Sequence, residues 1–306
     1  MARILVTGGA GFIGSHVVDG LIAAKHRVLV VDNLSTGNRR NLHEDAELMC
    51  EDIRSPRIRD LFRDFRPEYV FHLAAQISLR TSFQDPRKDA SINIDGSLNL
   101  IEQALRFPVK KFIFSSSGGA MYGLSKIRAA EDEQPQPLSP YGIAKYTVEQ
   151  YLERFQELYG LPAIALRYGN VYGPRQVPEG EAGVIAIFAG RLFKKMPLEM
   201  YGTGNQTRDY IYVSDVVQAN IAAMRPKVYG IFNIGTGHQT SLNALTKVII
   251  EQSGVRGRVK HRRAVKGEVK KISLDWRKAK RQLGWKPEVE LRDGIRETLN
   301  WAKGLV

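Results

Sequence analysis

The sequence predicts an α/β fold in which a doubly wound parallel sheet is followed by a smaller mixed α/β domain. In the first half of the chain, short apolar runs alternate with stretches of helical spacing. This alternation is typical of a parallel sheet that is covered by helices on both faces. A cluster of glycines separates the first apolar run from the first helical stretch. After Asn170, Gly and Pro become frequent and the expected strands become short.

The alternating pattern gives the expected elements in order. In the first half, strands are expected at 4–6, 28–31, 47–50, 69–73, 111–115 and 163–167, and helices at 12–23, 58–65, 92–105 and 141–159. Later helices are expected at 184–194, 214–224, 241–253 and 291–303, with short strands at 210–213 and 231–234. We expect residues 1–170 to form the first domain, which regains a segment around 208–236. Residues 171–306 form the second domain over the carboxyl edge of the sheet, where such folds bind ligands.

The glycine cluster lies between a predicted strand and a predicted helix. It fits two registers, which begin at Gly8 or at Gly9. In both registers, the glycines allow a tight turn and a close approach of the backbone to a pyrophosphate, which the N-terminus of the helix stabilises. The sequence therefore predicts a dinucleotide site that contains Gly8, Gly11, Phe12, Ile13 and Gly14.

The second predicted strand ends in Asp32, at the position where a carboxylate binds the adenosine ribose hydroxyls. A carboxylate there repels a 2′-phosphate, so NAD is favoured over NADP, although Arg39 and Arg40 follow. The alternative is that Asp32 only begins a loop. Together with the glycine turn, these features predict the NAD-binding (Rossmann) form of the doubly wound sheet. The adjoining loops add the candidate cofactor residues Asn33, Ser35, Thr36, Gly37, Asn38, Asp52 and Ile53.

Tyr141 and Lys145 are four residues apart in a predicted helix, and so share one face of it. A tyrosine phenol titrates near pH 10 in water and is a poor base at neutral pH. A nearby ammonium and the positive charge of oxidised nicotinamide favour the phenolate. The pair is therefore predicted to be a general base, Tyr141, with Lys145 lowering its pKa. The alternative is an exposed helix pair without a catalytic role.

Seven features occur in one order along the chain: TGGAGFIG, Asp32, HLAAQ, SSSGGAMYG, YGIAK, LRYGNVYGPR and RDYIYVSD. With them, the chain resembles the extended short-chain dehydrogenase/reductase family from end to end. Within that family it looks most like the UDP-glucose (galactose) 4-epimerases. The resemblance implies that NAD transiently oxidises C4 of a UDP-hexose and reduces it again on the opposite face. It also implies further cofactor contacts from Leu73, Ala74, Ala75, Gln76, Asn93, Ser115, Tyr141, Lys145 and Tyr168.

The segment before Tyr122 departs from the pattern of the family in two ways. The dehydratases and decarboxylases that it resembles carry a glutamate at the position of Ala120, so its absence favours epimerisation over elimination. Many members place Ser or Thr at the position of Gly118, to hydrogen-bond the sugar 4-hydroxyl. Ser117 is the expected replacement as a catalytic and sugar-binding residue, and Ser116 is the alternative.

The same resemblance implies the substrate site. Asn170 and Arg208 match residues that contact the diphosphate, and an arginine fork suits such a group. The alternative for Arg208 is a buried pair with Asp209 or Asp215. The second arginine of the family falls at Val265, two residues before Gly267-Glu268, so Arg263 or Lys266 is expected to replace it. Ile272 is expected near the sugar C2 substituent, unless it only packs in the core, and Val184 and Tyr201 complete the set.

Composition bounds the partners. The net charge is +13, and thirteen Lys or Arg residues lie between Arg256 and Lys286 against two acidic residues. This stretch is a solvated face or a field that attracts an anionic sugar nucleotide, and without regularly spaced stacking aromatics nucleic acid is not an expected partner. A single cysteine, Cys50, excludes a disulfide framework and a cysteine-based zinc site, and no metal is expected. No apolar run reaches the roughly 20 residues of a membrane span.

These observations predict a cytoplasmic isomerase of galactose metabolism with no membrane contact. The resemblance suggests a homodimer formed through the helices that begin near Ile92 and Tyr141. Two alternatives remain. One is a 4-epimerase of UDP-N-acetylglucosamine or UDP-glucuronate. The other is a non-catalytic dinucleotide-binding scaffold with a basic surface for RNA or a protein partner, against which the Tyr141/Lys145 pair argues.

Overall fold

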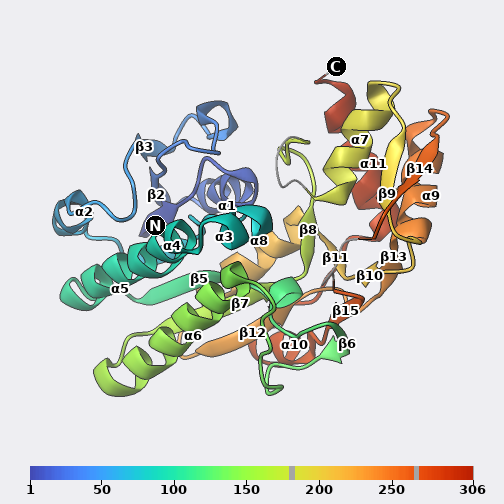
Figure 1. Cartoon of the computed structure of the whole chain (residues 1–306). Coiled ribbons are helices and arrows are strands. Elements are labelled where there is room, and N and C mark those ends of the chain that lie inside the picture. The colour runs from blue at the N-terminus through green and yellow to red at the C-terminus, as the bar shows by residue number, and fades with distance from the viewer. Residues whose placement is uncertain (179–182, 265–268, 306) are drawn as a thin grey trace.

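The computed structural model describes residues 1–178, 183–264 and 269–305 (Figure 1). Its largest element is a seven-stranded parallel sheet with the order β12-β7-β5-β4-β1-β2-β3. The strands are β1 (Arg3–Thr7), β2 (Arg27–Val31), β3 (Glu47–Met49), β4 (Tyr69–His72), β5 (Lys111–Ser117), β7 (Ala163–Tyr168) and β12 (Gly230–Ile234). The strand order reverses between β1 and β4, so the crevice for a ligand lies at their carboxyl ends. The predicted doubly wound parallel sheet is confirmed.

Two hydrophobic cores cover the two faces of this sheet. Successive side chains of a strand point to opposite faces, so Ile4 and Val6 join one core and Leu5 the other. On the first face lie α1 (Phe12–Ala23), α8 (Val213–Ala222) and α10 (Arg277–Leu283). On the second face lie α2 (Arg57–Phe65), α5 (Gly96–Arg106) and α6 (Pro140–Tyr159).

The seventh strand comes from late in the chain. β12 pairs with β7 in parallel, from Gly230 opposite Ile164 to Ile234 opposite Tyr168. The helix α8 that precedes it packs against the first core beside α1. The helix α10 also joins this core, through Ala279 and Leu283.

A second group of helices and strands, all after residue 170, lies on the right of Figure 1. A third core holds α7 (Val184–Phe193), α9 (Leu242–Ser253) and α11 (Leu291–Lys303) together. The described residues also form three small sheets. They contain β6 (Ser125–Ala129), β10 (Thr207–Arg208), β13 (Thr240–Ser241) and β15 (Lys271–Leu274); β8 (Asn170–Tyr172) and β11 (Tyr210–Tyr212); and β9 (Leu198–Tyr201) and β14 (Val259–Arg262).

One predicted helix is divided. The stretch expected at 92–105 begins earlier, with α4 (Pro86–Ala90), passes through a π-helical turn at Ser91–Asp95 and continues as α5. Asp85 caps the start by accepting from the Lys88 N–H, and Pro86 occupies the first turn, where its missing donor costs nothing. A short helix α3 (Leu79–Gln84) precedes it. Among the described residues, no helix is long and apolar enough to cross a bilayer.

Candidate active site

The glycine turn lies between β1 and α1, at the point where the strand order reverses. Gly8 has a φ of +71°, and a Cβ there would lie 2.5 Å from the backbone nitrogen of Ala74. A Cβ on Gly14 would overlap the Gly8 carbonyl oxygen. Gly11 is the N-cap of α1, whose first N–H groups, those of Phe12 and Ile13 among them, have no acceptor within the helix. The turn thus has no room for side chains at Gly8 and Gly14, and its glycines and free helix N–H groups fit the pyrophosphate of a dinucleotide.

The Asp32 carboxylate is 8% exposed and lies beside this turn. One oxygen accepts from the Ala10 N–H at 3.0 Å and the other from the Leu34 N–H at 2.8 Å. A Cβ on Gly37 would lie 3.0 Å from both carboxylate oxygens, so the loop at 33–38 folds closely over Asp32. Asp32 therefore organises its loop, as the alternative interpretation requires. Its role toward a ribose stays a prediction.

The exposed loop residues Asn33, Ser35, Thr36 and Asn38 surround Asp32. The Asn38 N–H donates to the Ala10 carbonyl at 2.9 Å, which holds the loop against the glycine turn. The candidate cofactor residues from this loop are therefore together on one side of the turn.

The candidate Asp52 already has strong partners. The Arg54 guanidinium donates to both of its oxygens at 2.8 Å, and Asn33 Nδ2 donates at 3.1 Å. The hydrogen bond from Arg54 is the main reason why the pKa of Asp52 lies far below its usual range. The adjacent Ile53 is buried beneath Gly96. Sequence reasoning did not anticipate Arg54.

The π-helical turn supplies a polar pair at the carboxyl end of β4, where half-buried Leu73, Ala74 and Ala75 follow the strand. The Gln76 N–H donates to Asn93 Oδ1, and Asn93 Nδ2 donates to the Gln76 carbonyl, both at 2.9 Å. Asp89 accepts from Gln76 Nε2 at 2.7 Å and from Asn93 Nδ2 at 3.1 Å. Burial raises the pKa of Asp89.

Tyr141 and Lys145 lie in the first turns of α6, against the carboxyl end of β5. Lys145 Nζ donates to the Ser115 carbonyl at 2.9 Å and lies 4.7 Å from the centre of the Phe114 ring. It is 5.9 Å from the centre of the Tyr141 ring. The Ser117 hydroxyl lies near the Tyr141 phenol and lowers its pKa. The structure thus brings all three predicted catalytic side chains together.

Burial shifts the pKa values of both side chains. It raises the pKa of Tyr141 to about 12, and the contact with Ser117 offsets this only in part. It also lowers the pKa of Lys145 to about 8. That Lys145 and the oxidised nicotinamide together favour the phenolate stays a prediction, since it concerns the protein with NAD bound.

The two candidate serines have different partners. Ser116 is 3% exposed, and its hydroxyl donates to Glu149 Oε1 at 2.5 Å, whereas Ser117 reaches Tyr141. A Cβ on Gly118 would lie 2.6 Å from a methyl carbon of the buried Leu274, so a serine at that position requires Leu274 to move. This packing explains the departure at Gly118. The different partners of the two serines favour Ser117 over Ser116 as the residue beside the phenol.

Tyr168 belongs to the core more than to the cleft. It is 4% exposed, and its hydroxyl exchanges hydrogen bonds with the Asn220 amide on α8 at 2.8 and 3.0 Å. Burial raises the pKa of its phenol.

The two diphosphate candidates lie on adjoining small sheets. Asn170, in β8, is exposed, and its Oδ1 lies 3.6 Å from the position of a Cβ on Gly119. Arg208, in β10, is half-buried and donates to the Thr207 carbonyl. The neighbouring Asp209 accepts from the N–H groups of Thr236, Gly237 and Leu274 and from the Thr236 hydroxyl, within 3.0 Å in each case.

The other substrate candidates are more scattered. Val184 begins α7, Tyr201 ends β9 and is exposed, and Arg263 is exposed after β14. Ile272 is 2% exposed in a cluster with Met121, Tyr122, Ala129 and Leu274, which agrees with the alternative that it only packs in the core. The candidate Lys266, together with Val265, Gly267 and Glu268, lies outside the described residues.

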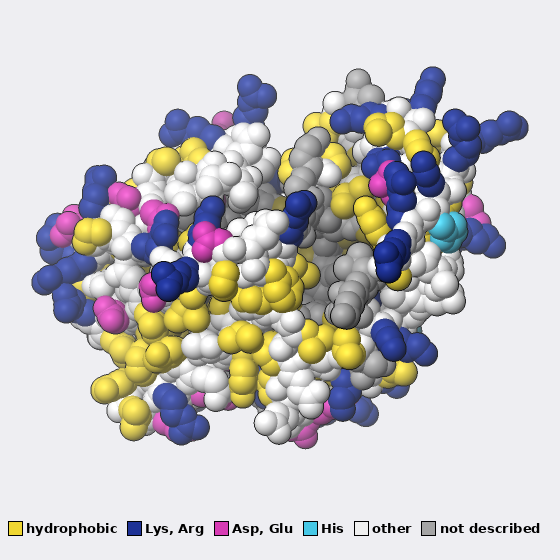
Figure 2. All heavy atoms as spheres, in the orientation of Figure 1, with side chains coloured by type: hydrophobic (Ala, Val, Ile, Leu, Met, Phe, Trp, Pro, Cys, Tyr) yellow, Lys and Arg dark blue, Asp and Glu magenta, His cyan; other side chains and the backbone are white. Residues whose placement is uncertain are grey.

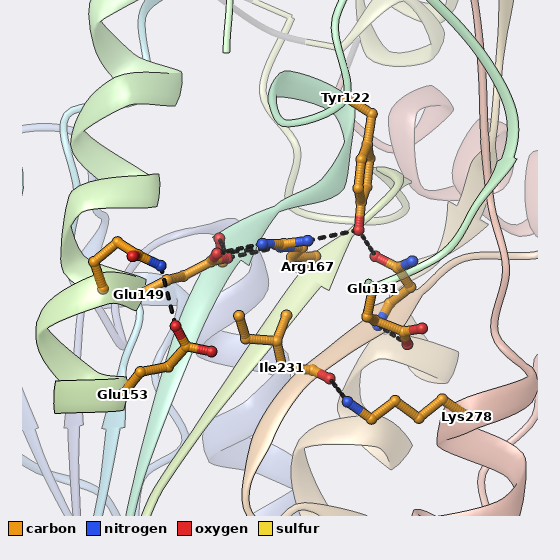
Figure 3. A network of polar contacts seen from close by, with 10 residues as sticks. Tyr122, Glu131, Glu149, Glu153, Arg167, Ile231 and Lys278 are labelled. Atoms are coloured by element: carbon orange, nitrogen blue, oxygen red, sulfur yellow. Dashed lines mark hydrogen bonds and ion pairs between the residues drawn. The ribbon is translucent and has the colours of Figure 1, made fainter. Parts of the chain in front are cut away.

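Sequence reasoning missed a buried ion pair behind the catalytic side chains. Glu149 and Arg167 are 0% and 1% exposed, and Arg167 Nη2 lies 2.6 Å from Glu149 Oε2 (Figure 3). The only sequence signal was that Glu149 follows Lys145 by four residues, on the same face of α6.

Comparisons with known proteins agree with this geometry. A model of the NAD dependent epimerase/dehydratase family matches residues 4–235. The chain is 46% identical over 301 residues to a putative UDP-glucose 4-epimerase of Methanocaldococcus jannaschii, with 98% of each covered. It is similar to a crystal structure of UDP-glucose 4-epimerase with UDP-glucose from Thermotoga maritima (TM-score 0.97, 49% identity, 99% of both chains). It is also similar to the Thermus thermophilus UDP-glucose 4-epimerase in complex with NAD (TM-score 0.95, 41% identity, 99% of this chain and 100% of that one).

Proposed function

The chain belongs to the NAD-dependent epimerase/dehydratase family, and on this premise we propose that it interconverts UDP-glucose and UDP-galactose by inverting C4. NAD is the cofactor. The observation that carries the proposal is the meeting of Tyr141, Ser117 and Lys145 at the carboxyl edge of an NAD-type sheet. These groups can move a proton to and from a sugar hydroxyl.

Tyr141 is the proposed base. It takes the proton of the 4-hydroxyl and later returns a proton to the same oxygen, so the protein gains and loses nothing over one cycle. When bound, NAD would accept the C4 hydride reversibly. The positive charge of its nicotinamide would also lower the pKa of the Tyr141 phenol, which burial raises to about 12. Ser117 orients the same hydroxyl. Lys145 contributes its positive charge while it remains protonated.

The residue at position 120 bears on whether the 4-keto sugar loses water or is reduced again. Ala120 has no acidic group, so the 4-keto sugar has no acid at this position that could assist the loss of water. Re-reduction is the simplest remaining step. Because re-reduction restores the oxidised cofactor, no second substrate is needed, and we propose that NAD stays bound through the cycle.

We assign the UDP diphosphate to Asn170 and Arg208, with Val184 and Tyr201 beside it. The boundary between the cofactor and substrate domains is placed at residue 170, with residues 208–236 returning to the cofactor domain. The pairing of β12 with β7 supports that return. The basic stretch from Arg256 attracts the anionic substrate over longer distances.

A homodimer is also part of the proposal. Apolar side chains are exposed along α6, at Ile143, Tyr151, Leu158 and Tyr159, and Figure 2 shows hydrophobic side chains gathered over the region of α5 and α6. A second copy that covered this face would bury them. We place the enzyme in the cytoplasm and in galactose metabolism. A fold with one exposed cysteine needs no oxidising compartment.

The test is turnover without added cofactor. Purified protein is incubated with UDP-galactose, UDP-N-acetylgalactosamine and UDP-glucuronate, and inversion at C4 is followed by chromatography. We expect UDP-galactose to be converted, and Tyr141→Phe to slow this conversion by about 10² to 10⁴. Preference for one of the other sugars would select the alternative substrate. No inversion of any sugar, even after NAD is supplied, would reject the proposal.

A further inference from the structure

Three consecutive serines at the end of β5 each contact a different residue of α6. The Ser115 carbonyl accepts from Lys145, the Ser116 hydroxyl donates to Glu149, and the Ser117 hydroxyl meets Tyr141. Residues four apart share one face of a helix, so Tyr141, Lys145 and Glu149 form a single row. The row has two members with proposed roles in proton transfer. The third, Glu149, has none.

Glu149 is the most rigidly held member of this row. Its two oxygens accept three contacts from the Arg167 guanidinium, at 2.6 to 3.2 Å, in addition to the Ser116 hydroxyl. A paired fork of this kind fixes geometry as well as charge. Figure 3 shows Arg167 lying between Glu149 and Tyr122.

The far end of the ion pair is also fixed. Arg167 Nη1 donates to the Tyr122 hydroxyl at 2.7 Å, and this hydroxyl donates to Asn233 Oδ1 at 2.8 Å (Figure 3). Asn233 lies in β12 and donates in turn to the Ala129 carbonyl and, through its N–H, to Glu131. The network therefore ties α6 to β7, β12 and the segment that follows β5.

A buried ion pair is seldom a net gain in stability, because removing two charges from water costs about what their attraction returns. What such a pair does supply here is a fixed position for the Ser116 hydroxyl. We propose that Glu149, held by Arg167, is a positioning residue that sets β5 against α6, so that Ser117 and Ser115 meet Tyr141 and Lys145. This inference rests on the proposed function.

The charges around Lys145 provide a second consequence. The charges of Asp89 from α4 and of Glu149 from its own helix act on Lys145, which lies 5.9 Å from the centre of the Tyr141 ring. The Lys145 charge in turn contributes to the lowered pKa of His72 in β4. Replacing Glu149 alone removes a negative charge and leaves Arg167 unpaired, and both changes disfavour the ammonium. The fall of kcat at alkaline pH should then move to lower pH in Glu149→Gln. In Glu149→Gln/Arg167→Met both charges of the pair are removed, so the alkaline fall of kcat should return to its original pH. The value of kcat itself should stay reduced.

The test measures kcat, KM and the pH profile for Ser116→Ala, Glu149→Gln and the double variant. Ser116→Ala leaves the ion pair intact and removes only the link to β5. We expect its kcat to fall about tenfold, which corresponds to about 1.4 kcal/mol, with KM within about twofold of the original. Lys111→Met is the matched control. Lys111 is buried at the other end of β5 and donates to the carbonyls of Arg225 and Val228, so its loss destabilises the same strand far from the site.

A titration that needs no turnover separates this inference from the proposed function. The ionisation of Tyr141 is followed by ultraviolet difference spectra against Tyr141→Phe, with NAD present. Ser116→Ala should raise the pKa of Tyr141, because a displaced Ser117 no longer stabilises the phenolate. If the unmodified protein epimerises no sugar, the proposed function fails and this titration still decides the inference.

Two results would overturn the inference. One is a folded Ser116→Ala protein whose kcat stays within about twofold of the original and whose phenol titrates unchanged. The other is a Lys111→Met protein that loses as much kcat as Ser116→Ala, since any weakening of β5 would then suffice. If Glu149→Gln does not fold, Ser116→Ala and the neutral double variant decide the matter.

Discussion

His72 should make the stability of the protein fall as the solution is acidified. It is 1% exposed in β4, and burial, with a smaller contribution from the Lys145 charge, lowers its pKa to about 3. Its Nδ1 lies 2.8 Å from Thr7 Oγ1, and its Nε2 lies 2.8 Å from Ser97 Oγ. The Ser97 hydroxyl donates to the Asn93 carbonyl at 2.6 Å, so Nε2 of His72 is the donor and Nδ1 accepts from Thr7. Only the neutral ring satisfies this chain of hydrogen bonds.

The magnitude follows from the two pKa values. The usual pKa of a histidine, 6.5, applies to His72 in the unfolded chain, and burial lowers this pKa to about 3 in the folded protein. Between these values the unfolded state binds the extra proton, so the free energy of unfolding rises with pH and is lost as pH falls. At about pH 4.5, two units below the unfolded value, the loss is about 2.7 kcal/mol, because each unit is worth about 1.4 kcal/mol.

The assay is urea denaturation followed by tryptophan fluorescence, at about pH 7.5 and about pH 4.5. His72→Gln keeps an acceptor and a donor but does not titrate. Between the two pH values its free energy of unfolding should therefore fall by about 2.7 kcal/mol less than that of the original protein. His238→Gln, at an exposed position, is the control and should follow the original protein. If the free energy of unfolding falls equally in the original protein and in His72→Gln, His72 does not cause the loss of stability at acidic pH.

Three further predictions follow from the site. Tyr141→Phe should lower kcat by about 10² to 10⁴, the usual contribution of general acid–base catalysis. The amount of NAD that the variant releases on denaturation should be unchanged. Loss of that bound NAD would mean that the variant damages the cofactor site instead. Gly118→Ser should lower the free energy of unfolding by about 1–3 kcal/mol, because its Cβ meets Leu274, and should not raise kcat; a faster enzyme would show that the site lacks a serine there. Asp32→Ala should weaken NAD binding and reduce the preference for NAD over NADP, as measured by titration of both cofactors; an unchanged ratio of affinities would leave Asp32 only its loop contacts.

The elements of the first half could be predicted because their signals are local. The helix at 12–23 and the strands around it were predicted from apolar periodicity, and the structure confirms them within one or two residues. The π-helical turn at Ser91–Asp95 could not be predicted, because its hydrogen bonds shift by one residue without any change in apolar spacing. The short strands β6 and β15 were missed because they pair with each other across nearly half the length of the chain.

The catalytic side chains could be predicted from their spacing, but their electrostatics could not. Burial sets the pKa of Tyr141 and Lys145, and burial depends on every element packed against α6. The choice between Ser116 and Ser117 depended on where Glu149 lies. Its partner Arg167 is 18 residues away in another element, so no local pattern joined them.

The late position of β12 has a consequence for synthesis of the chain. β7 is complete after residue 168, but its outer neighbour is not translated until residues 230–234. During that interval an emerging chain would present β7 as an unpaired and mostly apolar edge, a template for aggregation. The core on that face also waits for α8 and for α10, which ends at residue 283. The cofactor half is therefore expected to fold only when nearly the whole protein has left the ribosome, and a fragment that ends at residue 170 should not be stable alone.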